Sequence, residues 1–235
     1  MVFERVEIQS GGFFISADAT FCAGQITALI GPSGAGKSTL LAAIAGFANV
    51  TQGQLLLGGQ NMAGIAPAAR PVSLVFQDHN LFEHMSIAAN VALGLGADPR
   101  LKGPGRAEKR AAVAQALARV GLDARANALP GQLSGGERSR AALARALLRD
   151  KRVLLLDEPF AALGPGLRHD MLDLVAEISA ERGLTTLLVT HQPDDARRIA
   201  SQTALVDAGK LFAPQGTSSL LAAPPPALAA YLGQK

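Results

Sequence analysis

Residues 31–38 read GPSGAGKS and fit the spacing G-x-x-x-x-G-K-[ST]. A loop of this kind between a strand and a helix offers consecutive backbone N–H groups and a helix N-terminus to phosphate oxygens. Lys37 adds a positive charge, and Ser38 offers a hydroxyl to Mg²⁺. The alternative, a glycine-rich turn without a ligand, is the weaker interpretation because a strand and a helix are predicted on either side. The candidate nucleotide-binding residues are Gly31, Pro32, Ser33, Gly34, Ala35, Gly36, Lys37, Ser38 and Thr39.

A second candidate element is VLLLDE at residues 153–158, where an apolar strand ends in two acids. A phosphate loop needs an acid at the tip of a neighbouring buried strand, and Asp157 is predicted to hold Mg²⁺ there. Glu158 follows the strand and is predicted to act on a water near the γ-phosphate, either as a general base or by orienting it. Two acids that merely begin a surface loop are the alternative.

A second glycine-rich turn, QLSGGERSR, lies at residues 132–140. Ser134 followed three residues later by Glu137 predicts a capping box at the start of a helix. The bare N–H groups of that helix start also predict an anion site. Because the first loop already serves this chain's own nucleotide, the second is predicted to meet a nucleotide held by another molecule.

The elements that carry these motifs predict an α/β fold with a mainly parallel sheet, because continuous apolar strands alternate with helices. Residues 96–105 interrupt a helical stretch over 85–129, and residues 203–212 resemble a hairpin. No single shape is predicted for the tail at 223–235. Strands are predicted at 1–9, 24–31, 54–62, 70–77, 152–158 and 185–191, and helices at 40–47, 134–149 and 167–183.

Composition limits the choice of function. The 235 residues suit one domain, are 49% hydrophobic and 17% charged, and contain no apolar run near the length of a membrane span. A lone Cys22 and an N-terminus without the pattern of a secretory signal favour the cytoplasm. The net charge of +3 comes from dispersed Lys and Arg with few aromatic residues, so no nucleic-acid partner is expected.

The sequence LSGGE, between the phosphate loop and LLLDEP, resembles the signature motif of the ATP-binding cassette (ABC) ATPases. This resemblance implies a P-loop NTPase core over residues 1–235, with an N-terminal antiparallel β subdomain and an α-helical subdomain inserted at about 86–145. It implies ATP and Mg²⁺ as cofactors and a homodimer of two cassettes. Each signature motif, here Ser134, Gly135, Gly136 and Glu137, would touch the γ-phosphate of the ATP held by the other cassette.

Two further polar residues match this family's pattern. Gln77 in VFQD resembles the glutamine that senses Mg²⁺ and the attacking water, next to the membrane partner. His191 in LLVTHQ resembles the switch histidine that contacts the γ-phosphate. Taken alone, either residue is more often an ordinary polar residue at a strand end. The resemblance implies catalytic roles for Glu158, His191 and Gln77, and a Mg²⁺ site formed by Ser38, Gln77 and Asp157.

Longer stretches at residues 70–95, 129–137 and 154–175 are similar to the ATP-binding subunits of bacterial thiamine importers. This similarity implies uptake of thiamine, with its phosphates as further candidates, through a separate permease. A periplasmic solute-binding protein would take part indirectly, and the chain would lie at the cytoplasmic face of the inner membrane. Alternatives are an importer ATPase for iron, a polyamine or an anion, and a soluble ABC ATPase without a transport role.

Three positions depart from the family's pattern. Ser10 stands where an aromatic residue usually stacks on adenine, and Phe13 is a candidate substitute unless it belongs to the core. Gly164 replaces the aspartate that helps to couple the two ATP sites. Glu137 replaces the commoner glutamine and adds a negative charge, which the capping box gives a local reason to tolerate.

Overall fold

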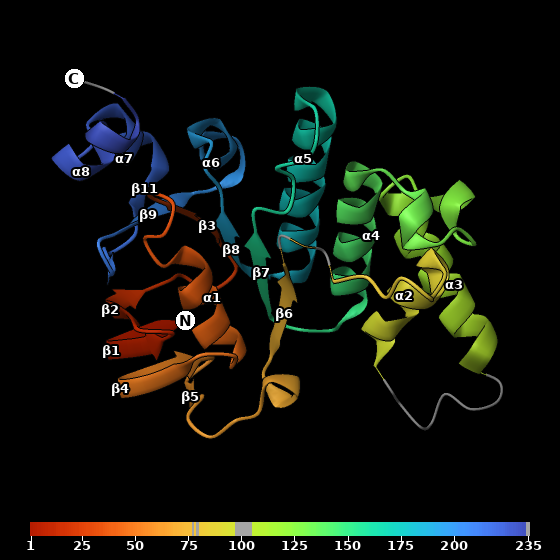
Figure 1. Ribbon diagram of the computed structural model, residues 1–235, viewed down its shortest axis with the longest axis horizontal. Coiled ribbons are helices and arrows are strands. Elements are labelled where there is room, and N and C mark those ends of the chain that lie inside the picture. The colour runs from red at the N-terminus through yellow and green to blue at the C-terminus, as the bar shows by residue number, and fades with distance from the viewer. Residues whose placement is uncertain (77, 79, 97–104, 234–235) are drawn as a thin grey trace. The chain divides into compact units, whose positions relative to one another are not determined.

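The computed structural model describes residues 1–76, 78, 80–96 and 105–233, which form two compact units. The first unit comprises Met1–Val72, Arg152–Glu158 and Leu172–Lys235. The second comprises Ser73–Lys151 and Pro159–Met171. Figure 1 shows the helices and strands of both units. The sequence-based bounds of the helical subdomain, 86–145, stay a prediction.

The first unit is built on a sheet with the strand order β5-β4-β1-β2-β10-β9-β3-β8-β7, and β11 pairs with β9. β3 is parallel to β8 and β9, and β7 is parallel to β8. β1 is antiparallel to β2 and β4, so the predicted parallel core and N-terminal antiparallel part are both confirmed. The strands are β1 (Val2–Ser10), β2 (Phe13–Thr20), β3 (Ile26–Ile30), β4 (Asn49–Leu57), β5 (Gln60–Asn61), β7 (Val153–Asp157), β8 (Thr185–Val189), β9 (Gln202–Asp207), β10 (Lys210–Leu211) and β11 (Gln215–Gly216).

The three neighbouring parallel strands β3, β8 and β7 are buried at every residue. Continuous apolar strands of this kind are typical of parallel sheets. Their register places Leu29 and Asp157 opposite Val189. The loops that follow the three strands therefore begin at the same edge of the sheet, and these loops carry the predicted phosphate, acidic and histidine residues.

The helices of the first unit are α1 (Lys37–Ala45), α6 (Pro193–Ile199), α7 (Thr217–Ala222), α8 (Pro226–Tyr231) and the later part of α5 (Pro165–Arg182). α1 ends at Ala45 with Gly46 as its C-cap, close to the end of the helix expected at 40–47. The buried guanidinium of Arg70 donates hydrogen bonds to the carbonyl oxygens of Ala43 and Ile44 at 2.7 and 2.9 Å. Arg70 thus satisfies carbonyl groups that the helix end leaves without partners.

Two segments differ from the sequence prediction. The single strand expected at 54–62 is a hairpin of β4 and β5, because Gly58 and Gly59 adopt positive φ angles of 57° and 81° that favour a tight turn. The tail at 223–235, for which no shape was predicted, contains α8. The hairpin expected at 203–212 is confirmed by the antiparallel pairing of β9 and β10.

The second unit contains α2 (Ile87–Ala92), α3 (Gly105–Arg119), α4 (Gly135–Leu148) and the start of α5, and β6 (Val72–Val75) leads into it. α2, α3 and α4 pack on one another. The fully buried Asn90 accepts a hydrogen bond from the Phe82 backbone N–H and donates to the carbonyl oxygens of Phe82, Met85 and Ser86. Over the described ranges, no helix is long and apolar enough to cross a membrane.

Candidate nucleotide-binding site

The phosphate loop runs from the end of β3 to the start of α1. The Lys37 side chain is only 5% exposed and its Nζ donates hydrogen bonds to the carbonyl oxygens of Gly31 and Pro32 at 2.7 and 2.8 Å. Burial lowers the pKa of Lys37, while the charges of Glu158 and Asp157 oppose that shift. The Lys37 ammonium group thus ties the two ends of the loop together through these hydrogen bonds. It also interacts electrostatically with Asp157 and Glu158.

The conformation of this loop requires glycine at its last position. Gly36 has φ +106°, and a Cβ atom there would press on the side chains of Phe13 and Ile15. No side-chain hydrogen bond caps the start of α1 within the described structure. The first N–H groups of α1 are therefore available to an anion, as the motif predicted.

Asp157 ends β7 and is 8% exposed. Burial raises the pKa of its carboxyl group; a hydrogen bond from the Ser38 side chain opposes the shift, the Glu158 charge adds to it, and Lys37 and His191 oppose it. Among the described atoms, its Oδ1 is buried without a hydrogen-bond partner. A buried carboxylate oxygen with unused lone pairs beside a serine hydroxyl is the kind of hard oxygen pair that suits Mg²⁺.

Glu158 follows Asp157 with an unusual backbone. Its φ angle is +47°, in the left-handed region that costs a non-glycine residue about 1–3 kcal/mol. Its N–H donates to the carbonyl oxygen of Val189 at 3.2 Å. Residues held in such conformations cluster at active sites, where the surrounding structure maintains them.

His191 lies beside Glu158. Its Nε2 is 2.5 Å from Glu158 Oε1. The pairing of Asp157 with Val189 explains this contact. Glu158 and His191 follow these two paired residues, so they leave adjacent parallel strands at the same edge of the sheet. The loop of His191 is fixed by Thr190, whose hydroxyl donates to Asp195 at 2.5 Å and accepts from the Gln192 N–H at 3.1 Å.

Two aromatic residues extend this site. Phe13 is half-buried in β2. Its ring lies against the phosphate loop, because a Cβ atom on Gly36 would come within 2.7 Å of it. Ser10 is exposed. Tyr231, at the end of α8, contacts His191 through its hydroxyl. Sequence reasoning missed Tyr231, since no local pattern connects it with a residue 40 positions earlier.

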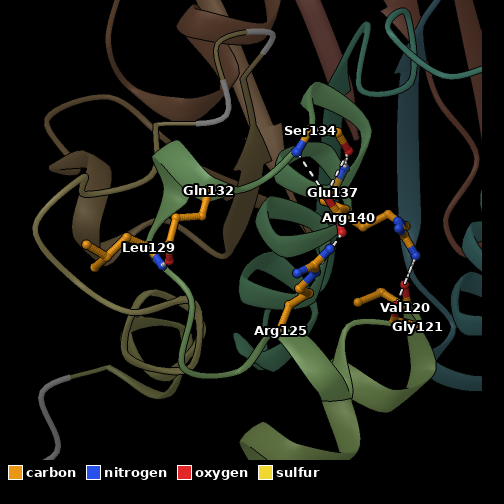
Figure 2. A network of polar contacts seen from close by, with 8 residues as sticks. All are labelled: Val120, Gly121, Arg125, Leu129, Gln132, Ser134, Glu137 and Arg140. Carbon is orange, nitrogen blue, oxygen red and sulfur yellow. Dashed lines mark hydrogen bonds and ion pairs between the residues drawn. The ribbon is translucent and has the colours of Figure 1, made fainter.

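The second glycine-rich motif starts α4 in the second unit (Figure 2). Ser134 Oγ accepts a hydrogen bond from the Glu137 N–H at 3.2 Å, and Glu137 Oε2 accepts one from the Ser134 N–H at 2.8 Å. The predicted capping box is confirmed. The Ser134 hydroxyl also donates to Glu137 Oε2 at 2.9 Å, so this carboxylate oxygen accepts two hydrogen bonds from Ser134.

Arg125 explains how this motif accommodates the charge of Glu137. Its Nε donates to Glu137 Oε1 at 3.1 Å. The backbone N–H of Ser134 is the largest cause of a lowered pKa at Glu137, the Ser134 hydroxyl is the next, and Arg125 adds to both while slight burial opposes them. Gly135 and Gly136 occupy the first turn of α4, beside Ala162 and Leu163.

The remaining predicted residues are placed as follows. Gly164 precedes α5, and its carbonyl oxygen accepts the first helical hydrogen bond from Arg168 at 3.0 Å. Gln77 lies outside the described residues. The phosphate loop, Asp157, Glu158 and His191 thus lie together within the first unit, whereas the signature motif belongs to the second unit.

The parallel sheet, with a glycine-rich loop between β3 and α1 and acids at the end of β7, defines the first unit as a P-loop nucleotide-binding fold. A family described as ABC transporter matches residues 16–161. The chain therefore belongs to the ABC transporter family, and it is an ATPase of the ATP-binding-cassette type.

Curated relatives match nearly the whole chain. The thiamine import ATP-binding protein ThiQ of Cereibacter sphaeroides is 56% identical over 98% of this chain and 98% of that protein. ThiQ of Ruegeria sp. is 52% identical over 98% of each chain. Among solved structures, the dimeric ATP-binding cassette MJ0796 in a post-hydrolysis state with ADP and Pi is 26% identical, with a TM-score of 0.80 over 92% of this chain and 97% of that one. These matches confirm the resemblance and the fold class inferred from the motifs.

Proposed function

We propose that this chain binds and hydrolyses ATP to energise the uptake of thiamine through a separate membrane permease. The observation that carries the proposal is the cluster in the first unit, where a phosphate loop, a buried acid and a glutamate–histidine pair meet at one sheet edge. The thiamine assignment rests on similarity to relatives named as thiamine import proteins. No residue of this chain is expected to touch thiamine.

ATP binding begins at the phosphate loop. The backbone N–H groups of residues 33–36 and of the start of α1 surround the β- and γ-phosphates, and Lys37 turns from the loop carbonyl groups to the phosphate oxygens. We infer that Phe13 stacks on the adenine, because its ring lies beside the loop and Ser10 offers no aromatic face.

Ser38 and Asp157 would hold Mg²⁺, since their oxygens are adjacent and Asp157 Oδ1 has no hydrogen-bond partner among the described atoms. The metal would neutralise negative charge on the phosphates. Gln77 is proposed to complete this set. In phosphoryl transfer the protein contributes mainly positioning and charge stabilisation, and these residues provide both.

Glu158 and His191 are proposed to act on the attacking water and the γ-phosphate. In the ligand-free protein the carboxylate and the imidazole contact one another at 2.5 Å. When ATP is bound, Glu158 accepts a proton from the water as it attacks, and His191 Nε2 donates a hydrogen bond to a γ-phosphate oxygen. The hydrogen bond from the Glu158 N–H to the carbonyl oxygen of Val189 helps to hold this residue at the sheet edge in its left-handed conformation.

The catalytic unit is proposed to be a homodimer in which Ser134, Gly135, Gly136 and Glu137 meet the ATP held by the partner. The Ser134 hydroxyl then exchanges Glu137 for a phosphate oxygen, while Arg125 retains Glu137. The similar solved cassettes are dimeric structures, which supports this assembly. Closure of the two cassettes around ATP is the step that moves the permease.

The permease is proposed to dock on the helical part of the second unit, at the cytoplasmic face of the membrane. Exposed apolar side chains there include Phe82 at 49% and Leu129 at 43%. A solute-binding protein outside the membrane would contact the permease and not this chain.

The test combines hydrolysis and uptake. Glu158→Gln should still bind ATP but hydrolyse it at least about a hundredfold more slowly than the wild type, because a general base contributes a factor of about 10²–10⁴. Cells whose own copy is replaced by this variant should lose labelled-thiamine uptake and keep iron uptake. Glu4→Gln, at an exposed glutamate in β1, is the matched control and should retain both activities.

Each alternative gives a different result. Unchanged ATP turnover in Glu158→Gln would refute the role of Glu158. Loss of iron, polyamine or anion uptake with intact thiamine uptake would assign another solute. ATPase activity stimulated by nucleic acid rather than by a permease would favour a soluble ABC ATPase without a transport role.

A further inference from the structure

The hydroxyl group of Tyr231 contacts His191 at two atoms. Its oxygen lies 3.2 Å from the ring nitrogen Nδ1, and the hydroxyl is within hydrogen-bond distance of the His191 carbonyl oxygen, also at 3.2 Å. The other ring nitrogen, Nε2, faces Glu158. The imidazole is therefore held between Tyr231 on one side and Glu158 on the other.

Packing fixes α8, which carries Tyr231. Tyr231 and Leu232 pack against a buried cluster that joins α7 and α8 to the sheet: Ile30, Leu205, Leu220, Leu221 and Leu228. Leu228 of α8 is completely buried. Ile30 is the last residue of β3 and directly precedes the phosphate loop. The helix is thus anchored to the same strand end that starts the nucleotide site.

The chemistry of a phenol suits this position. A hydroxyl has one proton and can also accept hydrogen bonds. When Tyr231 donates to Nδ1, His191 carries its proton on Nε2 and can donate it to Glu158. When Tyr231 donates to the His191 carbonyl oxygen, its own oxygen accepts a hydrogen bond from Nδ1–H instead. In both arrangements Nδ1 is engaged and the plane of the ring is fixed, as a hydrogen bond to one nitrogen commonly fixes a functional histidine.

We propose that Tyr231 is a positioning residue for ATP hydrolysis: through Nδ1 it holds the His191 ring so that Nε2 faces Glu158 and the γ-phosphate. This proposal rests on the function proposed above for His191 and Glu158. Tyr231 itself touches neither ATP nor the attacking water. The consequence is that α8 contributes to ATP turnover through this hydroxyl group and not through the tightness of its packing.

The first test removes only that hydroxyl. Tyr231→Phe keeps the ring that packs on the buried cluster. Loss of one hydrogen bond to a catalytic group corresponds to a rate factor of about two to ten. We expect kcat for ATP to fall by about that factor while KM for ATP stays within about twofold, because phosphate binding by the loop is unchanged.

The matched control loosens the packing and keeps the hydroxyl. Leu232→Ala removes part of the neighbouring apolar contact. It should lower Tm more than Tyr231→Phe does and leave kcat within about twofold at a temperature well below its Tm. Equal loss of kcat in the two variants, or a wild-type kcat in Tyr231→Phe, would overturn the positioning role.

A spectroscopic test detects the contact independently of hydrolysis. Tyr231 is the only tyrosine in the sequence, which contains no tryptophan, so the absorbance of phenolate reports this residue alone. Burial, and secondly the charge of Glu158, raise the pKa of Tyr231 above its ordinary value. Glu158→Gln should therefore move the titration midpoint down, and an unchanged midpoint would contradict the geometry.

His191→Gln separates the two proposals. If it lowers turnover strongly while Tyr231→Phe does not, the role of His191 stands and the positioning role of Tyr231 fails. If His191→Gln leaves turnover unchanged, both the proposed role of His191 and the inference about Tyr231 are refuted. Nitrogen-15 shifts of the His191 ring add a direct readout, since Tyr231→Phe should change the proton distribution between Nδ1 and Nε2.

Discussion

Asp157→Asn tests the metal site through protein stability, without relying on activity. In the ligand-free protein, Asp157 is a buried carboxylate whose Oδ1 has no hydrogen-bond partner among the described atoms. A buried polar atom without a partner costs about 1–3 kcal/mol. Asparagine keeps the shape and removes the charge, but its amide protons also need acceptors. We therefore expect a gain at the low end, about 1 kcal/mol, which raises Tm by about 2–4 °C in a protein of this size.

Mg·ATP should reverse the order of thermal stability of the wild type and Asp157→Asn. A ligand at a hundred times its Kd stabilises the protein that binds it by about 2.7 kcal/mol, which corresponds to roughly 5–10 °C in Tm. The wild type should show this gain. Asp157→Asn lacks a charged metal ligand and should show much less of it. The variant is thus expected to be the more stable protein without ligand and the less stable one with it.

Calorimetry measures Tm for both proteins alone, with Mg·ATP, and with ATP plus EDTA. Asp150→Asn changes an exposed aspartate and should stay within about 0.5 kcal/mol of the wild type in every condition. Lys37→Ala should lose the gain from ATP, because the loop then lacks its positive charge. The reasoning fails if ligand-free Asp157→Asn is no more stable than the wild type, or if Mg·ATP stabilises both equally.

The same pair of proteins makes a prediction for pH. Because burial raises the folded-state pKa of Asp157 above its unfolded value, the folded protein binds this proton more tightly than the unfolded chain. The resulting stabilisation is fully present below the unfolded pKa of about 3.9 and is lost as the pH rises through the folded pKa. The advantage of Asp157→Asn over the wild type should therefore be small near pH 4 and increase toward neutral pH, and an advantage independent of pH would contradict the assignment.

Two further predictions concern the departures from the family's pattern. Glu137→Gln should lower the free energy of unfolding by less than about 1 kcal/mol in urea titrations, because an amide oxygen still accepts from the Ser134 N–H and only the half-exposed Arg125 loses its ionic partner. A larger loss would mean that the ion pair supports the motif. Gly164→Asp should fold with a gain of a few tenths of a kcal/mol, since the space around Gly164 is open and aspartate caps helices well. It should also steepen the dependence of hydrolysis on ATP concentration if the missing aspartate limits coupling between the two sites.

The parts of the site that sequence predicted are those that local chemistry determines. The apolar runs of β3 and β7 are interpreted as buried strands, and every residue of both strands is buried. β3 is followed directly by Gly31 of the phosphate loop, and β7 ends in Asp157. The Ser134 capping box is equally local, since its two partners lie three residues apart and their atoms meet wherever a helix begins there. The end of α1 is also determined locally, because its C-cap residue Gly46 adopts the left-handed conformation that glycine favours.

The parts that sequence did not predict depend on contacts distant in the chain. α8 is rich in alanine and follows a run of prolines, so its position depends on the buried cluster around Leu228 and not on its own pattern. The positive φ of Glu158 leaves no signal in a sequence where glutamate follows a strand. The register that aligns Asp157 with Val189 decides that Glu158 meets His191, and a register is a property of two strands together.

The groups proposed to handle phosphate already have partners in the ligand-free protein. Lys37 donates to loop carbonyl oxygens, the Ser134 hydroxyl to Glu137, and His191 contacts Glu158. ATP must therefore exchange existing hydrogen bonds for new ones, and each exchange contributes only the difference between the two. Asp157 Oδ1 is different, because it has no hydrogen bond to another described atom that a metal would have to replace. The metal should accordingly account for a large share of the net binding free energy, and the gain in Tm that ATP loses when EDTA is present measures that share directly.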